Sequence, residues 1–174
     1  MVTRGAFTAL IAAVALQRLF ELERSRCNER RIRAMGGSEH APGQVAWMKA
    51  LHTGWLAGSC LEVWLRRPAP PLGLVGSALA AFVAGQWLRR SAMRALGWRW
   101  NVRILTLPRA PLVAGGPYRH LRHPNYVGVA LEIAALPLLG GAYWSALLFS
   151  VANAALLRAR IREEQTALDR ALRA

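Results

Sequence analysis

The sequence predicts an all-α integral membrane protein with about five transmembrane helices. Of its 174 residues, 54% are apolar and only 18% are charged. Two long stretches, Pro68–Leu88 and Ile133–Leu157, contain no Asp, Glu, Lys or Arg. Uncharged runs of this length are typical of membrane spans. The formal net charge is nevertheless +14, which places a strongly basic surface outside the apolar runs.

Three apolar segments in the first half predict three spans, at Gly5–Phe20, Val45–Leu65 and Pro70–Leu88. Residues 21–35 between the first two are polar and helix-forming, so we expect an interfacial or cytosolic helix there. Gly36 and Gly37 follow it, and glycine commonly ends a helix.

The last apolar segment, Tyr126–Leu157, predicts a helical hairpin. As one helix its 32 residues would be about 48 Å long, whereas a single span needs only about 30 Å. Pro137 and the pair Gly140-Gly141 lie near its middle, where proline interrupts helical hydrogen bonding and glycine permits a reversal. We therefore expect two shorter helices, which gives five spans in all.

The distribution of Lys and Arg predicts the orientation. With the N-terminus outside and the C-terminus in the cytosol, all 23 basic residues except Arg4, Arg66 and Arg67 face the cytosol. A four-span arrangement would put the basic tail opposite the preceding basic loop, and cleavage of a signal peptide after Ala15 would leave the first basic loop outside. We therefore expect one membrane domain over residues 1–174. The use of arginine with a single lysine favours a bacterial inner membrane.

The residue types present argue against nucleic-acid binding, a disulfide scaffold and a metal site. The arginines are not interleaved with stacking aromatic residues, so nucleic-acid binding is not favoured. Cys27 and Cys60 are too few for a disulfide scaffold. His120 and His123 lack a recognisable set of further metal ligands, so no metal site is expected.

Two polar clusters flank the predicted hairpin on its cytosolic side. The first is the loop from Leu112 to Gly128, which is dense in Gly, Pro, His, Arg and Tyr, and in which Asn125 is a candidate cap for a helix starting near Tyr126. The second follows the last span, where Arg160 and Glu164 share one face of a helix. Because both clusters border the same hairpin, we expect them to converge.

These residues resemble the isoprenylcysteine carboxyl methyltransferase family, in the wider group of membrane phospholipid methyltransferases. The resemblance covers roughly residues 110–170, with weaker likeness at Arg24–Asn28, Gly36-Gly37 and His52 to bacterial members, some of which modify long-chain polyketide lipids. It is carried by Gly116-Pro117-Tyr118, by Arg122-His123-Pro124-Asn125-Tyr126-Val127-Gly128, and by Arg160 with Glu163-Glu164.

The resemblance implies S-adenosyl-L-methionine as methyl donor, bound from the cytosol, and a lipophilic acceptor that enters from the bilayer. Arg160 would face the acceptor, and Glu164 would meet the amino group of the donor, in a pocket formed mainly by residues 103–170. Ala110 and Arg103 depart from the eukaryotic members, which carry histidine and glutamine there. The implied donor-binding residues are Leu112, Val113, Gly116, Tyr118, His123, Pro124, Asn125, Tyr126 and Glu164.

Glu132 is the candidate general base if the acceptor is a phenol or an enol, whereas a carboxylate acceptor needs none. An ionisable residue within a span should face the protein interior, so an ion pair with an arginine of a neighbouring helix is the alternative role. For Glu62, in the second span, we expect packing or a hydrogen bond between helices.

Two other functions remain open on the sequence. A nicotinamide-dependent membrane reductase of the sterol-reductase type would share a similar arrangement of C-terminal helices, and a non-catalytic lipid-binding membrane protein would use none of these motifs chemically. For a methyltransferase, the sequence does not rank prenylcysteine, alkylresorcinol, alkylpyrone and phospholipid acceptors.

Overall fold

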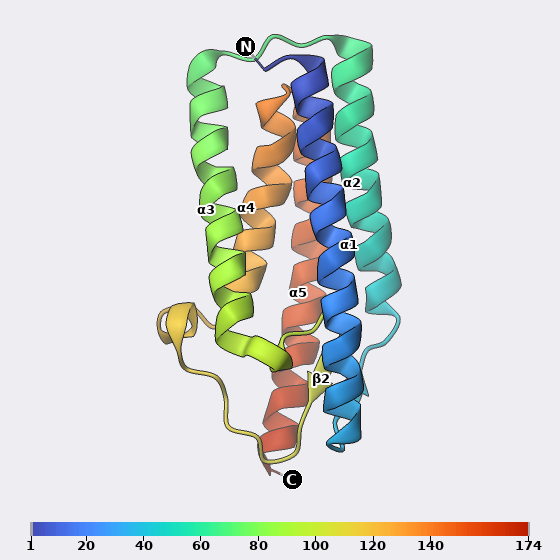
Figure 1. The fold of residues 1–174 in the computed structure, drawn as a ribbon, viewed down its shortest axis with the longest axis vertical. Helices are drawn as coiled ribbons and strands as arrows, with labels where there is room; N and C mark the ends of the chain where they lie inside the picture. Colours follow the sequence, from blue (N-terminus) through green and yellow to red (C-terminus); the bar gives the residue numbers. More distant parts are fainter. Residues whose placement is uncertain (1, 174) are drawn as a thin grey trace.

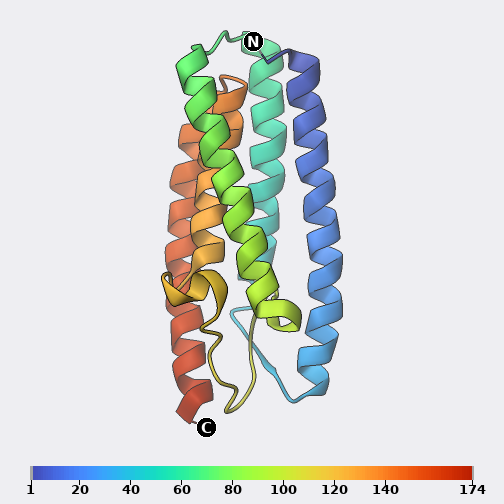
Figure 2. The same cartoon turned by 60° about the vertical axis from the view of Figure 1, so that its left-hand side comes forward.

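The fold, described over residues 2–173 by a computed structural model, is a bundle of long helices lying side by side (Figures 1 and 2). Successive helices run in opposite directions, and the N- and C-termini lie at opposite ends of the bundle (Figure 1). The described residues form α1 (Arg4–Ala34), α2 (Gln44–Arg66), α3 (Leu72–Leu96), α4 (Pro124–Leu139) and α5 (Tyr143–Arg173).

Helix α1 joins two elements that the sequence predicted separately, the span Gly5–Phe20 and the polar helix 21–35. Its 31 residues correspond to about 46 Å, so it is longer than the apolar layer of a bilayer. The chain leaves the helix through Gly36, which has a positive φ of 82°, and the Gly37 N–H donates to the Ile32 carbonyl at 2.9 Å. The predicted glycine stop is therefore confirmed.

The predicted hairpin is confirmed as α4 and α5. Pro137 lies near the end of α4, and Gly141 has a φ of 77°, a conformation that favours glycine. Glu62 of α2 accepts hydrogen bonds from the N–H groups of Trp144 and Ser145, at 3.1 and 2.8 Å, at the start of α5. This confirms the hydrogen bond between helices expected for Glu62, and its negative charge suits a helix N-terminus.

The start of α4 differs from the prediction. The helix begins at Pro124, and no side chain caps it, so the capping role expected of Asn125 is wrong. Proline suits the first helical position because its missing N–H would have no partner there. Likewise α3 continues to Leu96, past the end of the predicted span at Leu88, so Arg89 is a buried helical residue.

The all-α prediction missed a small antiparallel sheet at the polar end of the bundle. Strand β1 (Ser38–His40) pairs with β2 (Ile104–Thr106), and two short 3-10 helices follow α3 and precede α4, η1 (Gly97–Arg99) and η2 (Gly116–Arg119). The sheet ties the segment after α1 to the segment after α3.

Helices α3 and α4 approach closely through a pair of glycines. A Cβ on Gly85 would lie 2.9 Å from the Gly128 carbonyl oxygen, and one on Gly128 would lie 2.8 Å from that of Gly85. Small residues allow such backbone approach between membrane helices. The contact brings Arg89 of α3 against α4.

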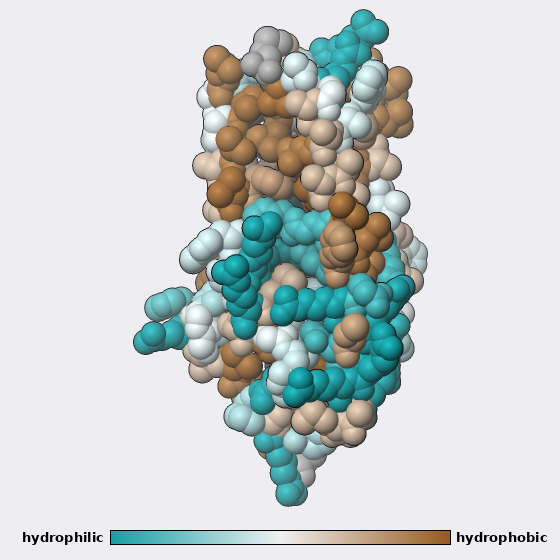
Figure 3. Space-filling view, viewed as in Figure 1, coloured by the Kyte–Doolittle hydropathy of each residue, from teal (hydrophilic) through white to brown (hydrophobic). Residues whose placement is uncertain are grey.

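The surface divides into an apolar part near the N-terminal end and a hydrophilic part near the C-terminus (Figure 3). Helix α1 and the stretch Leu72–Arg99 are long and apolar enough to cross a membrane, and α4 is a shorter apolar helix. Inside the bundle, the indole N–H of fully buried Trp55 donates to the Ile133 carbonyl at 3.1 Å and joins α2 to α4. The fold is that of a helical membrane protein, and the count of five spans stays a prediction.

Candidate functional site

Two cavities meet toward the polar end of the bundle. The inner cavity, of about 180 Å³, lies among all five helices, α1 to α5, and its wall includes Arg18, His52, Arg89, Asn153 and Arg160. The outer cavity, of about 500 Å³, is bounded by β2, the loop after it and the end of α5. The outer volume is within the range of small-molecule sites. The residues that line both cavities are Leu96, Asn101, Tyr118, His123 and Glu164.

The two clusters expected to converge do meet at this junction. The Tyr126 hydroxyl donates to Glu164 Oε2 at 2.6 Å, and His123 Nδ1 lies 3.7 Å from the same oxygen. The His123 ring stacks on the Tyr126 ring with a centroid distance of 5.4 Å. The Arg160 guanidinium lies over the same Tyr126 ring, 5.9 Å from its centroid.

Arg160 is buried with part of its hydrogen-bonding capacity unused. Its side chain is 3% exposed, and Nη2 donates to the Val102 carbonyl at 2.8 Å. Within residues 2–173, its Nε and Nη1 atoms have no hydrogen-bond partner although both are buried. Buried N–H groups of a charged side chain are costly without acceptors, so these two atoms point to a ligand in the inner cavity.

Four of the other predicted donor-binding residues line one of the two cavities. Leu112 and Val113 line the outer cavity, and so do Ala110 and Arg103, the two positions that depart from eukaryotic members. Asn125 and Tyr126 line the inner cavity.

Gly116 and Pro124 line neither cavity and shape the backbone instead. Gly116 has a φ of 57°, and Pro124 begins α4.

Tyr118, at the junction of the cavities, is a hydrogen-bond donor. Burial, and after it the negative charge of Glu164, raises the pKa of the Tyr118 phenol above its usual value. The hydroxyl therefore stays protonated at physiological pH and can donate to a ligand oxygen.

Glu132 lies in a buried ion-pair network. Its Oε2 pairs with Arg18 of α1 and lies 3.5 Å from Arg89 Nη1 of α3, and Arg89 Nη2 lies 2.5 Å from Glu21. Glu132 is 1% exposed and lines neither cavity, whereas both arginines and Glu21 line the inner one. These contacts match the ion-pair role considered for Glu132, and its role as a base stays a prediction.

Two inner-cavity residues were not among the predicted site residues, although His52 was noted in the resemblance to bacterial members. Asn153 of α5 is 2% exposed, and its Oδ1 has no hydrogen-bond partner among the described residues. His52 Nδ1 bonds the Met48 carbonyl at 2.8 Å, which assigns the proton to Nδ1 and leaves Nε2 as an acceptor. An asparagine inside an uncharged run was the available signal for the first, whereas His52 belongs to no local motif.

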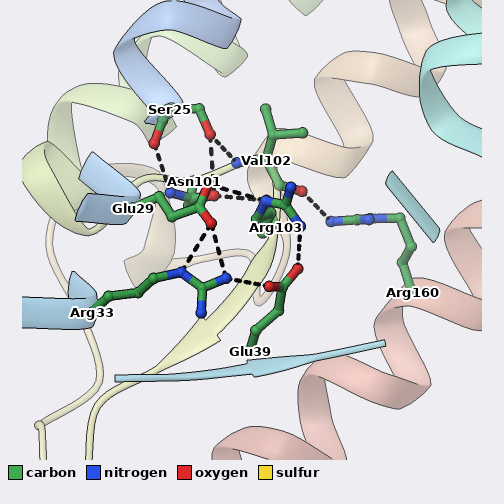
Figure 4. A network of polar contacts seen from close by, with 8 residues as sticks. All are labelled: Ser25, Glu29, Arg33, Glu39, Asn101, Val102, Arg103 and Arg160. Carbon is green, nitrogen blue, oxygen red and sulfur yellow. Dashed lines mark hydrogen bonds and ion pairs between the residues drawn. The ribbon is translucent and has the colours of Figure 1, made fainter. Parts of the chain in front are cut away.

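A second ion-pair network closes the polar end of the bundle (Figure 4). Arg103 of the β2 segment pairs with Glu39 of β1 and, at 3.0 Å, with Glu29 of α1, and Arg33 pairs with the same two carboxylates. Burial alone would raise the pKa of Glu39, but the hydrogen bonds from Arg103 and Arg33 outweigh it and lower that pKa below 4.5. Glu39 is therefore ionised at neutral pH and joins β1 to the wall of the outer cavity.

Comparison with known proteins identifies relatives. The family model of the isoprenylcysteine carboxyl methyltransferase (ICMT) family matches residues 78–170. The uncharacterized protein YpbQ of Bacillus subtilis (strain 168) is 38% identical over 163 residues, which are 94% of this chain and 96% of that protein. The protein-S-isoprenylcysteine O-methyltransferase of Schizosaccharomyces pombe is 34% identical over 94 residues, 53% of this chain but only 40% of the yeast protein. No solved structure matches the chain.

Proposed function

Because this chain belongs to the isoprenylcysteine carboxyl methyltransferase family, we propose that it transfers a methyl group from S-adenosyl-L-methionine to an oxygen of a lipophilic acceptor. The family is one of membrane methyltransferases, and a yeast protein-S-isoprenylcysteine O-methyltransferase is similar to about half of the chain. The observation that carries the proposal is the junction of the two cavities, where Tyr126 and His123 lie against the Glu164 carboxylate and Arg160 lies over the Tyr126 ring.

The outer cavity is the proposed donor site. S-adenosyl-L-methionine carries an ammonium group, a carboxylate and an adenosine, so its site needs an anion, hydrogen-bond donors and an apolar wall. Glu164 supplies the anion, Tyr118 and His123 supply polar groups beside it, and Leu112 and Val113 supply apolar surface. When bound, the donor provides an activated methyl group, and this pocket would hold it at the junction with the inner cavity.

The inner cavity is the proposed acceptor site. Most of the buried polar atoms that lack a hydrogen-bond partner within residues 2–173 belong to its wall, and most of those are N–H groups. They come from Arg18, Arg89, Trp100 and Arg160. A wall rich in unused donors suits a head group that presents oxygen atoms, and its cations favour an anionic oxygen.

The residues contribute by positioning and by charge. Methyl transfer forms a bond from the acceptor oxygen to the methyl carbon and breaks the carbon–sulfur bond, whose electrons remain on sulfur. Holding the reactants at attack distance is worth up to about 7–11 kcal/mol in favourable cases. A carboxylate acceptor is already an anion, so it would bind the N–H groups of Arg160 that lack a partner among the described residues, and would need no base to remove a proton. For a phenol or an enol, the nearby cations lower the pKa of the hydroxyl, with Glu132 as the proposed base.

We further propose that this is one membrane domain with five spans in a bacterial inner membrane and with the site at the cytosolic face. The hydrophilic end of the bundle, which carries both cavities' polar walls and the basic segments, supports that orientation (Figure 3). The site draws on more of the chain than residues 103–170, because α1 and α2 contribute to the inner cavity.

The test is a methyl-transfer assay on protein purified in detergent, with S-adenosyl-L-[methyl-³H]methionine. The acceptor panel is N-acetyl-S-farnesyl-L-cysteine, 5-pentadecylresorcinol, a long-chain alkylpyrone and phosphatidylethanolamine. We expect label in at least one of the oxygen acceptors, and none from protein heated above its melting temperature. Calorimetric binding of NADPH without binding of S-adenosylhomocysteine would contradict the proposal in favour of a reductase. Binding of neither would favour a non-catalytic protein.

A further inference from the structure

A polar joint between α1 and the segment after α3 lies next to Arg160 (Figure 4). Ser25 is on the buried face of α1, at 4% exposure, and Asn101 and Val102 follow η1. The Ser25 hydroxyl donates to Asn101 Oδ1 at 3.1 Å, and Asn101 Nδ2 donates to the Ser25 carbonyl at 2.9 Å. The Asn101 side chain therefore binds both the hydroxyl and the backbone carbonyl of Ser25, across 76 residues of sequence.

This joint fixes the peptide unit that holds Arg160. The Val102 N–H donates to the Ser25 hydroxyl oxygen at 3.0 Å, and the Arg103 N–H donates to Asn101 Oδ1 at 2.7 Å. The Val102 carbonyl, on the other side of the same residue, accepts from Arg160 Nη2 at 2.8 Å. Ser25 thus reaches Arg160 through one residue of backbone.

The Val102 carbonyl accepts a hydrogen bond from Arg160 Nη2, while Nε and Nη1 have no hydrogen-bond partner within residues 2–173. A guanidinium held by one hydrogen bond follows the movements of its acceptor, so its orientation is fixed only if the acceptor is also fixed. Arginine side chains also have several rotatable bonds, whose ordering costs free energy. A rigid Val102 carbonyl would remove that cost before the acceptor binds.

We propose that Ser25 and Asn101 are positioning residues for the methyl-transfer reaction. By fixing the Val102 carbonyl, they orient the Arg160 guanidinium so that its Nε and Nη1 groups, unpartnered within the described part of the chain, are available to the acceptor. This inference rests on the proposed function. It assigns a role in acceptor binding to α1, outside the region 78–170 that the family model matches. The ion pairs of Arg103 with Glu29 and Glu39 support the joint from its other side.

The test compares Ser25→Ala with Ser25→Thr, which keeps the hydroxyl, and with Ser59→Ala as matched control. Ser59 is also fully buried, donates to a backbone carbonyl, that of Trp55 at 2.6 Å, and lines neither cavity. The measurements are the melting temperature, the Kd for S-adenosylhomocysteine, and kcat and KM for the member of the acceptor panel that the wild type methylates fastest.

For Ser25→Ala we expect about a fivefold loss of kcat/KM for the acceptor, since a net hydrogen bond is worth roughly 1 kcal/mol and 1.4 kcal/mol is tenfold. Donor affinity should be unchanged, Ser25→Thr should recover most of the loss, and Ser59→Ala should match the wild type. In an Arg160→Ala background, Ser25→Ala should have no further effect, because residues acting through one another are not additive.

Additive losses in the double variant, or a loss that follows only the melting temperature, would overturn the positioning role. If the wild type binds S-adenosylhomocysteine and Ser25→Ala has normal kinetics, the inference fails while the proposed function stands. If the wild type binds no S-adenosylhomocysteine, the proposed function itself fails.

Discussion

The Tyr126 hydroxyl donates a hydrogen bond of 2.6 Å to the Glu164 carboxylate, and so joins the first turn of α4 to the C-terminal part of α5. The two residues lie 38 positions apart, on the two arms of the hairpin. One Glu164 oxygen is therefore held in place, close to His123, at the junction of the cavities. A fixed carboxylate at this point is the feature on which the proposed donor site depends.

Tyr126→Phe removes the hydroxyl that holds Glu164 and keeps the ring that stacks on His123. We expect the Kd for S-adenosylhomocysteine to rise by about tenfold or more, because hydrogen bonds to charged groups are worth about 1.5–3 kcal/mol. Calorimetry on detergent-purified protein measures this. Tyr143→Phe, at the opposite end of α5, is the control and should bind normally. Equal affinities in the two variants would show that this hydrogen bond does not organise the site.

Glu132→Gln separates the two roles of Glu132. Removing the Glu132 charge leaves Arg18 and Arg89 with Glu21 as their one remaining shared carboxylate among the described residues, so we expect a loss of about 3–5 kcal/mol in stability. Thermal unfolding followed by tryptophan fluorescence measures the loss. A variant that keeps the wild-type melting temperature and loses turnover would instead assign Glu132 as the general base.

Asn153→Leu tests whether the unpartnered amide serves a ligand. The substitution removes a buried polar group from an apolar part of α5, so the melting temperature should not fall. The KM for the acceptor should rise, because the inner cavity loses a polar contact. Ala152→Leu, on the exposed side of the same helix, should change neither quantity. A lower melting temperature with an unchanged KM would make Asn153 a structural residue.

Glu39→Gln tests the ion pairs between β1 and Arg103 through their pH dependence. A carboxylate whose pKa is lowered in the folded state contributes stability above its unfolded pKa, near 4.5, and loses that contribution as the pH falls through the folded value. The melting temperatures of wild type and variant should therefore differ by a constant amount from pH 8 to about pH 5 and converge below pH 4.5. Glu23→Gln, at an exposed ion pair, is the control. A difference that persists undiminished to pH 3 would contradict these ion pairs.

The helices and the convergence of the site were predictable because they follow from local signals. Apolar runs located the helices, and Pro137 with Gly140-Gly141 located the reversal between α4 and α5. Charge placement put the loop around His123 and the helix of Arg160 and Glu164 on one side of the bundle. Neighbouring arms of a short hairpin are adjacent, so their contact followed from topology.

Long-range polar contacts were not predictable, since they depend on how distant helices are rotated and aligned. Ser25 and Asn101 meet across 76 residues, and nothing local to either marks the other. The pairing of β1 with β2 was missed for the same reason, because each strand has only three residues. Asn125 was assigned as a cap from its residue type, whereas Pro124 set the start of α4 two residues before the expected start near Tyr126.

The most direct test of the account is calorimetric titration of S-adenosylhomocysteine into the purified wild type, Glu164→Gln and Glu163→Gln. Glu164 faces the junction of the cavities, and its neighbour Glu163 is exposed, so the pair changes one charge at adjacent positions. The account predicts saturable binding by the wild type, unchanged binding by Glu163→Gln, and affinity reduced at least about tenfold in Glu164→Gln. An absence of binding by the wild type, or equal affinities in all three proteins, would contradict it.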